Sequence, residues 1–368
     1  MKWLMFWRNK TSSSSSSITP TGQSEREVSR HELPADTSTP YFADTPLTDP
    51  SLDRFRRWPF AQRVAQTIAQ RLDSSSLVIG IYGSWGEGKT TVFHYIQHEL
   101  KKHPNIICVS FNPWRYSEET QLLRSFFLIL AEALNKSITT RREEIGEALQ
   151  KLSSLVTLLS DNVGSGLEGI GSLLSSVELE TYKQRLERIL RAEGKRIVIL
   201  MDDIDRLDRN EIQAVFRLVK LSADFAYTAY ILAFDEDAVA DALGEKYGSG
   251  SKEAGYKFLE KIISVPLRLP RVDPLALREL CLEHIAEALK LADIVLTDIQ
   301  RQALMEAIDT GLLARLQTPR MVKRYSNALV FALPILRGEV NSVDLILIEG
   351  MCCLTGILSP LTDKMSPL

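Results

Sequence analysis

Long apolar runs are missing from this sequence of 368 residues. No stretch of about 18 or more residues is apolar throughout, so we predict no membrane-spanning helix. Cysteine is scarce too, and its four copies show neither metal-ligand spacing nor a disulfide pattern, which favours a reduced, cytoplasmic protein. A large excess of charge is also absent. The net charge of −3 provides no general attraction to nucleic acid, so a nucleic-acid partner is not expected.

A glycine-rich loop is the most informative feature that is present. Residues 83–90 read Gly-Ser-Trp-Gly-Glu-Gly-Lys-Thr and match the pattern G-x-x-x-x-G-K-[ST]. The apolar run at 77–82 has the length of a buried strand, and residues 91–100 carry apolar side chains at helical spacing. A strand, a glycine loop and a helix in this order are the context in which the motif binds phosphate. We therefore predict that the chain binds a nucleoside triphosphate, the alternative being a glycine-rich turn with a chance lysine.

Each part of this loop has an expected role at the nucleotide. Glycines allow a sharp turn and expose backbone N–H groups to phosphate oxygens, and the N-terminal end of the following helix adds positive potential. Lys89 is expected to reach the β- and γ-phosphates, and the Thr90 hydroxyl to ligate Mg²⁺. ATP and Mg²⁺ are thus the expected cofactors. The expected nucleotide contacts in the loop are Gly83, Ser84, Trp85, Gly86, Glu87, Gly88, Lys89, Thr90 and Thr91.

A second apolar strand is predicted at 196–201, and the carboxylates of Asp202, Asp203 and Asp205 follow it. Ligands of open α/β sheets bind beyond the carboxyl ends of the strands, so these side chains are expected beside the loop. Asp202 is the predicted Mg²⁺ partner, through water, because Mg²⁺ keeps much of its hydration shell. Asp203 is the predicted catalytic partner of Lys89, because a carboxylate there can handle the water that attacks the γ-phosphate.

Further acidic positions leave alternatives open. Asp205 and Arg206 are either part of a switch that reads the γ-phosphate or a capping pair that holds the turn after the strand. Asp235 follows another predicted strand at 228–234. At the end of this strand, a polar group is expected either to contact the γ-phosphate or to orient water. A carboxylate at that place would repel phosphate unless a cation lay between them.

The chain divides into a tail, a core and a helical end. Residues 1–40 are polar and serine-rich, which is typical of a disordered tail; the short aromatic tip at 1–10 indicates either a peripheral membrane contact or a loosely packed end. Residues 41–270 contain the strands, with a helical insertion at 137–178. Residues 271–368 form a helical lid. The pattern predicts an α/β fold: a P-loop NTPase three-layer αβα sandwich with a mostly parallel sheet, followed by an all-helical C-terminal domain.

Weaker patterns complete the core. Apolar runs predict further strands at 106–111 and 264–270. A helix is predicted at 61–72, ahead of the first strand, and residues 41–50 are expected to form an extended arm before it.

Taken together, these motifs resemble those of the KAP family of P-loop NTPases, a relative of the STAND and AAA+ groups in the additional-strand class. The resemblance covers about residues 41–330, and many members carry transmembrane segments between the two Walker motifs, which the insertion of this chain lacks. It implies a link to phage exclusion and to membrane-associated signalling complexes. The motifs that carry it are the loop with its tryptophan, Phe-Asn-Pro-Trp at 111–114, Asp-Asp-Ile-Asp-Arg at 202–206, Phe-Leu-Glu-Lys-Ile-Ile at 258–263 and Thr-Pro-Arg at 318–320.

The resemblance also draws Arg320 into the predicted site. This arginine either contacts bound phosphate from the helical domain, acts on the site of a neighbouring subunit, or is an ordinary surface arginine. We therefore expect an Mg²⁺-dependent ATPase that works as a conformational switch with a protein partner or as a homo-oligomer. The alternatives are a nucleotide-gated scaffold with negligible turnover and an AAA+-like DNA-processing ATPase.

Overall fold

The computed structural model describes residues 42–116, 118–138, 177–222, 224–247 and 251–355, which lie in a compact unit that begins at Pro40. The predicted tail, its aromatic tip and most of the predicted insertion lie outside these residues, so those expectations stay predictions. Among the helices that the described residues form, none combines the length and the apolar character needed to cross a bilayer.

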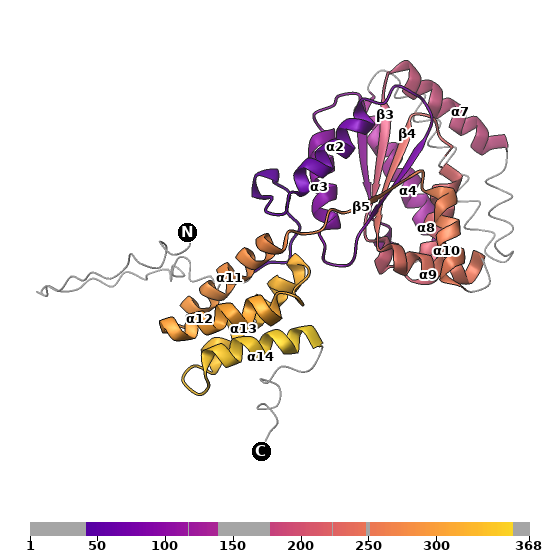
Figure 1. Ribbon diagram of the computed structural model, residues 1–368. Coiled ribbons are helices and arrows are strands. Elements are labelled where there is room, and N and C mark those ends of the chain that lie inside the picture. The colour runs from indigo at the N-terminus through magenta and orange to yellow at the C-terminus, as the bar shows by residue number, and fades with distance from the viewer. Residues whose placement is uncertain (1–41, 117, 139–176, 223, 248–250, 356–368) are drawn as a thin grey trace, which may run out of the picture. The chain divides into compact units, whose positions relative to one another are not determined.

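A parallel sheet of five strands forms the centre of the core (Figure 1). Its order is β2-β3-β4-β1-β5, so β4 separates the strand before the glycine loop from the strand before the carboxylates. Both features therefore emerge at the carboxyl edge of one sheet, which is where such sheets bind ligands. The predicted α/β fold is confirmed. The strands are β1 (Leu77–Tyr82), β2 (Ile106–Phe111), β3 (Arg196–Met201), β4 (Thr228–Phe234) and β5 (Val265–Arg268).

Helices cover both faces of this sheet and give the predicted three layers (Figure 1). Successive residues of a strand point to opposite faces, and the side chains of β3 accordingly divide between two apolar clusters. One face is covered by α2 (Arg57–Ala69) and α3 (Lys89–Leu100). The other face is covered by α4 (Glu119–Ser137), α7 (Val177–Ala192), α8 (Arg209–Ser222) and α9 (Glu236–Tyr247).

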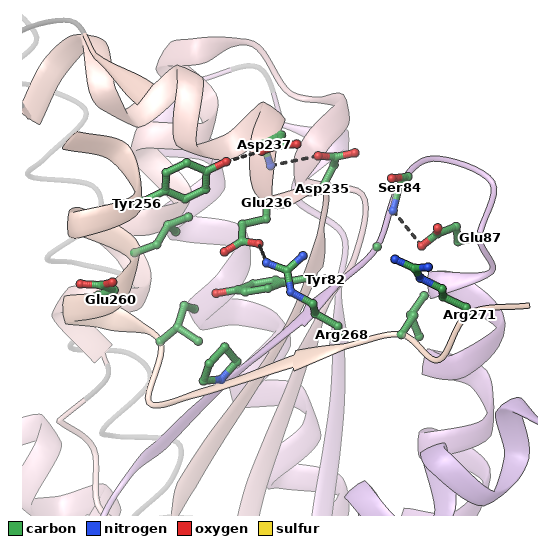
Figure 2. Close-up of a pocket in the computed structure, with 15 residues that line it drawn as sticks. Tyr82, Ser84, Glu87, Asp235, Glu236, Asp237, Tyr256, Glu260, Arg268 and Arg271 are labelled. Atoms are coloured by element: carbon green, nitrogen blue, oxygen red, sulfur yellow. Dashed lines mark hydrogen bonds and ion pairs between the residues drawn. The ribbon is translucent and has the colours of Figure 1, made fainter. Parts of the chain in front are cut away.

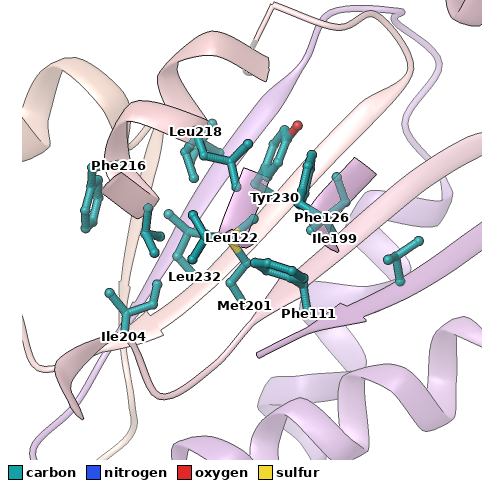
Figure 3. Close-up of a cluster of buried hydrophobic side chains, with 14 of the residues drawn as sticks. Phe111, Leu122, Phe126, Ile199, Met201, Ile204, Phe216, Leu218, Tyr230 and Leu232 are labelled. Carbon is teal, nitrogen blue, oxygen red and sulfur yellow. The ribbon is translucent and has the colours of Figure 1, made fainter. Parts of the chain in front are cut away.

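The second of these clusters is rich in aromatic side chains (Figure 3). Phe111 at the end of β2 contacts Phe126 of α4 edge to face, with ring centroids 5.4 Å apart. Phe216 of α8 packs in the same way on Phe234 at the end of β4, at 5.7 Å. Each such ring contributes about 1.5–3 kcal/mol by leaving water. The ends of β2 and β4 are thus anchored directly behind the predicted site.

Helix α2 begins earlier than the sequence pattern predicts. We expect it at 61–72, but it spans Arg57–Ala69. The prediction is wrong because Pro59 looks like a boundary, whereas proline fits the first turn of a helix, where its missing N–H has no partner to lose. Asp53 fixes this start, since its carboxylate accepts hydrogen bonds from the backbone N–H groups of Phe55 and Trp58 at 3.2 and 2.7 Å.

Helices α9 and α10 (Lys252–Ile262) join β4 to β5 and pack backbone against backbone. A Cβ atom at Gly255 would lie 1.8 Å from the carbonyl oxygen of Ala240, so only glycine permits this approach. No layer of side chains separates the two helices at this point.

The described residues after β5 are helical and have an apolar core of their own. Tyr325 and Leu329 lie at its centre, fully buried. The helices are α11 (Pro274–Leu291), α12 (Asp298–Ala307), α13 (Pro319–Ile335) and α14 (Ser342–Thr355). Because residues from Pro40 onward form one compact unit, the domain boundary expected near residue 270 stays a prediction.

Candidate nucleotide site

The glycine loop connects β1 to α3 in a conformation that requires glycine at two positions. Gly86 and Gly88 have φ angles of +87° and +97°, which side-chain-bearing residues rarely adopt. Apart from Gly88 and its two chain neighbours, no atom lies within 4 Å of the place where a Cβ of Gly88 would stand, so the loop is open there. A Cβ at Gly86, in contrast, would come within 2.9 Å of the Cβ of Arg320. The loop is thus open on one side and in tight contact with α13 on the other.

Lys89 is buried at the first turn of α3 and is held by three acceptors. Its ammonium group donates to the carbonyl oxygens of Gly83 and Ser84 at 2.8 and 3.4 Å. It also forms an ion pair with the Asp205 carboxylate at 2.9 Å, and both side chains are only 7% exposed. The lysine that we expect at the β- and γ-phosphates therefore has a protein carboxylate as its partner here.

Asp205 connects this lysine to the end of β4. The carboxylate oxygen that contacts Lys89 also accepts the backbone N–H of Asp235 at 3.1 Å. The Asp235 carboxylate faces its own helix and accepts the N–H groups of Asp237 and Ala238 at 3.0 and 3.3 Å, as an N-cap of α9 does. Sequence reasoning left the partner of Asp205 open, since the two charges lie 116 positions apart.

Asp202 and Thr90 meet at the carboxyl end of β3 and carry the donors that Mg²⁺ prefers. The Thr90 hydroxyl lies beside the Asp202 carboxylate. Burial raises the pKa of Asp202, and the charge of the neighbouring Asp203 raises it further, whereas the Thr90 hydroxyl, the Asp203 N–H and the charge of Lys89 lower it. A nearby divalent cation would restore the charged form. One hydroxyl and one carboxylate fit Mg²⁺, which takes its other ligands from phosphates and water.

Asp203, the predicted group for the attacking water, lies in an unusual backbone conformation. Its φ angle is +60°, and its carboxylate forms an ion pair with Arg206 at 2.7 Å. The guanidinium carbon of Arg206 in turn lies 5.6 Å from the ring centroid of Trp114. A strained residue next to a predicted metal ligand is a common feature of active sites. The role of Asp203 stays a prediction.

Arg320 approaches the loop from the N-terminus of α13. Its guanidinium carbon lies 4.0 Å from the ring centroid of Trp85, a cation–π contact with the exposed tryptophan of the loop. It also forms an ion pair with Asp44 at 2.6 Å. Thr318 caps the helix by accepting the N–H of Met321, so the positive end of α13 points toward the same place.

Arg57 is a residue of the site that sequence reasoning missed. It is 3% exposed and donates to the carbonyl oxygen of Glu87 in the loop at 2.9 Å and to that of Pro270 after β5. Burial lowers the pKa of this guanidinium, while Glu87 and Asp53 oppose the shift. The signal was weak, because an arginine in a basic segment gives no hint that it is buried.

The loop borders a hollow of about 980 Å³, which is also lined by residues of α9, α10 and β5 (Figure 2). Some of the charged side chains that line it have partners within the protein. Arg268 contacts Glu236 at 2.5 Å, and the Tyr256 hydroxyl contacts Asp237. Glu87 lies at its edge, where its carboxylate accepts the N–H of Ser84 at 3.0 Å and braces the loop.

The glycine loop, the carboxylates after β3 and Arg320 lie within one matched domain. The family model of the KAP family P-loop domain matches residues 57–336, which is more than half of the chain. This chain belongs to the KAP family. As a member, it carries a nucleotide-binding P-loop NTPase domain, and the match includes the glycine loop, the carboxylates after β3 and Arg320. The predicted family is confirmed.

A curated relative agrees with this assignment. The phage T7 exclusion protein of Escherichia coli (strain K12) is 25% identical over 346 residues, which cover 83% of this chain and 45% of that protein. The chain thus spans about half the length of this relative.

Solved structures show weaker similarity. The Aeropyrum pernix ORC2 protein in its ADP form has a TM-score of 0.41 at 15% identity, covering 84% of this chain and 71% of that chain. A variant of Thermotoga maritima RuvB has a TM-score of 0.35 at 16% identity, covering 84% of this chain and 72% of that chain. Both scores lie below 0.5, and the family assignment depends on the sequence match alone.

Proposed function

We propose that this KAP family protein binds and hydrolyses ATP with Mg²⁺ and uses the nucleotide as a conformational switch. One observation carries the proposal: Lys89 of the loop and the Thr90–Asp202 pair lie together at the carboxyl edge of the sheet. A cation for phosphate and an oxygen site for a metal are the two parts that phosphoryl transfer requires.

The residues divide the chemistry among them. The loop N–H groups and Lys89 bind the phosphates, and Lys89 must leave Asp205 to do so. Thr90 and Asp202 would hold Mg²⁺, which when bound neutralises charge on the β- and γ-phosphates. Asp203 orients the attacking water and accepts its proton, with Arg206 fixing the direction of the carboxylate.

The switch is proposed to run between the core and the helices after residue 270. Arg320 is the reporter, because it contacts the loop through Trp85 and belongs to α13. In the cell, we propose a cytoplasmic protein that works with a protein partner or a second copy, in a membrane-associated signalling or phage-defence complex. Similarity to the phage T7 exclusion protein supports the phage-defence part of this proposal.

Binding and turnover are tested separately with two variants. Lys89→Ala should abolish binding of ATP, measured by titration calorimetry, whereas the exposed Lys101→Ala at the end of the same helix should bind normally. Asp203→Asn should bind ATP and hydrolyse it roughly 10²–10⁴-fold more slowly, with the exposed Asp224→Asn as a control. Wild-type turnover in Asp203→Asn would remove this residue from the mechanism. Normal ATP binding by Lys89→Ala would overturn the site.

A nucleotide-gated scaffold with negligible turnover is the second candidate. The ion pair between Asp203 and Arg206 favours it, because a carboxylate held by arginine is not free to contact the attacking water. Hydrolysis measured against protein concentration separates the candidates. Turnover per subunit that rises with concentration indicates an assembling ATPase, and tight binding without turnover at any concentration indicates the scaffold. DNA-stimulated turnover with steep salt dependence would instead indicate the DNA-processing alternative.

A further inference from the structure

Residues 42–49, here called the arm, are fastened to the helices that follow the core. Phe42 and Asn327 of α13 exchange two hydrogen bonds, from the Phe42 N–H at 2.9 Å and to the Phe42 carbonyl at 3.2 Å. The Phe42 ring stacks on His284 of α11, with centroids 3.7 Å apart. Lys323 donates to the carbonyl oxygen of Ala43 at 2.8 Å.

The other end of the arm is fastened to α3, the helix that begins with Lys89. The Leu47 N–H donates to the hydroxyl of Thr91 at 3.2 Å, and the Leu47 carbonyl contacts Nδ1 of His94 at 3.3 Å. Thr91 directly follows the predicted metal ligand Thr90. The arm thus joins the first turn of the loop helix to α11 and α13.

Asp44 lies between these two attachments and holds Arg320. The carboxylate contacts Nε of Arg320 at 2.6 Å while the same guanidinium stacks on Trp85. The two side chains are 33% and 28% exposed, so the pair is partly hydrated and can exchange for another anion at low cost. A phosphate bound at the loop would be such an anion, because the stem of Arg320 lies directly against Gly86.

We infer that Asp44 is a positioning residue that competes with the γ-phosphate for Arg320 and so sets the preference of this site for ATP over ADP. The inference assigns the exchange to the γ-phosphate, which ATP carries and ADP lacks. The inference rests on the proposed ATP binding. Exchange of Asp44 for phosphate also removes one attachment of the arm, so ATP, unlike ADP, loosens residues 42–49 from their neighbours.

The size of the effect follows from the exposure of the pair. A partly exposed ion pair at this distance changes an equilibrium about two- to five-fold. Asp44→Asn should therefore tighten binding of a non-hydrolysable ATP analogue about two- to five-fold and leave ADP binding unchanged. Asp44→Glu keeps the charge and should behave as the wild type. Asp49→Asn is the control. The Asp49 carboxylate belongs to the same arm, is exposed and accepts the N–H of Ser51 rather than contacting Arg320, so this substitution should change the affinity for neither ATP nor ADP.

A double substitution separates this role from a general loosening of the arm. With Arg320→Gln present, Asp44→Asn should have no further effect on ATP affinity, because the residue through which it acts is gone. Hydrogen exchange gives an independent readout. The backbone N–H groups of Phe42 and Leu47 should exchange faster when wild-type protein binds the ATP analogue, and at their original rate with ADP.

The outcomes distinguish this inference from the proposed function. If the wild type binds the ATP analogue and Lys89→Ala does not, yet Asp44→Asn leaves ATP affinity unchanged or weakens ATP and ADP equally, the inference fails and the proposed function stands. Slower exchange at Phe42 and Leu47 with ATP would overturn it as well. If the wild type binds no nucleotide, the proposed function fails and the inference falls with it.

Discussion

We expect Asp205→Asn to destabilise the nucleotide-free protein far more than the nucleotide-bound protein. The pair of Lys89 and Asp205 is almost fully buried, with 2.9 Å between the charged atoms. Removing one member of such a pair costs about 3–5 kcal/mol. In the variant, the carbonyls of Gly83 and Ser84 still accept hydrogen bonds from the lysine, and the new amide oxygen can do the same. The free energy of unfolding should therefore fall by about 2–3 kcal/mol.

Bound ATP should cancel most of this loss, because its phosphates replace the carboxylate as the partner of Lys89. Thermal unfolding is the assay, with and without a non-hydrolysable ATP analogue and Mg²⁺. At about 2–4 °C per kcal/mol, the melting temperature of the nucleotide-free variant should fall by about 4–12 °C. Asp208→Asn removes a nearby exposed carboxylate that caps α8, a position where asparagine serves equally well, and should change little.

A loss of the same size with and without nucleotide would refute this reasoning, since it would mean that Asp205 and the phosphates never share Lys89. Lys89→Met offers a second check. In the Asp205→Asn background, Lys89→Met should lower stability much less than in the wild type. The reason is that the wild-type substitution leaves the Asp205 carboxylate buried without its partner, whereas the amide at this position in the variant carries no charge. Equal costs in both backgrounds would show that the two charges are not coupled.

Three further outcomes are expected. Gly86→Ala should lower stability by about 1–3 kcal/mol and weaken ATP binding, because alanine is strained at this φ and its Cβ meets Arg320; wild-type affinity would contradict this. Arg57→Met should cost about 1–3 kcal/mol in chemical denaturation by leaving two partly buried carbonyls without their donor, whereas a neutral effect would mean that water replaces the guanidinium. Burial, with Arg54 and Lys323 nearby, lowers the pKa of His284 to about 4 from 6.5, so its contribution to stability is complete above pH 6.5 and is lost as the pH falls toward 4. His284→Gln should flatten that part of the stability profile, and an unchanged profile would assign the pH dependence to other groups.

The parts of this fold that could be predicted from the sequence are those whose signal lies in a short run of consecutive residues. The strands at 77–82 and 228–234 are nearly continuous apolar runs, as is typical of strands buried on both faces of a parallel sheet. The loop at 83–90 combines glycines with a lysine at fixed spacing, because the glycines expose backbone N–H groups to phosphate and the lysine must reach the same phosphates. Both kinds of signal are local, so one sequence is enough to read them.

The partners of the charged residues could not be predicted, because they depend on which distant segments meet. Nothing near Asp205 in the sequence indicates that it faces Lys89, and nothing near Asp44 points to Arg320. Asp203 illustrates the same limit in the backbone: a left-handed conformation at an aspartate has no signature in the neighbouring residues. The start of α2 was missed for a different reason, because proline ends some helices and begins others.

The close contact between Gly255 and the carbonyl of Ala240 has a consequence for the two helices that it joins. Where helices touch through their backbones, no side chains lie between them that can slide or repack, so we expect α9 and α10 to move together. The two helices are attached to Asp235 at one end and to β5 at the other. Leu269 follows β5 directly and lies against the glycine loop: a Cβ atom at Gly83 would be 2.8 Å from the Leu269 side chain. If Lys89 exchanges Asp205 for phosphate, as proposed, we therefore expect a displacement of Asp235 to pass through α9, α10 and β5 to Leu269, which lies against the glycine loop at Gly83.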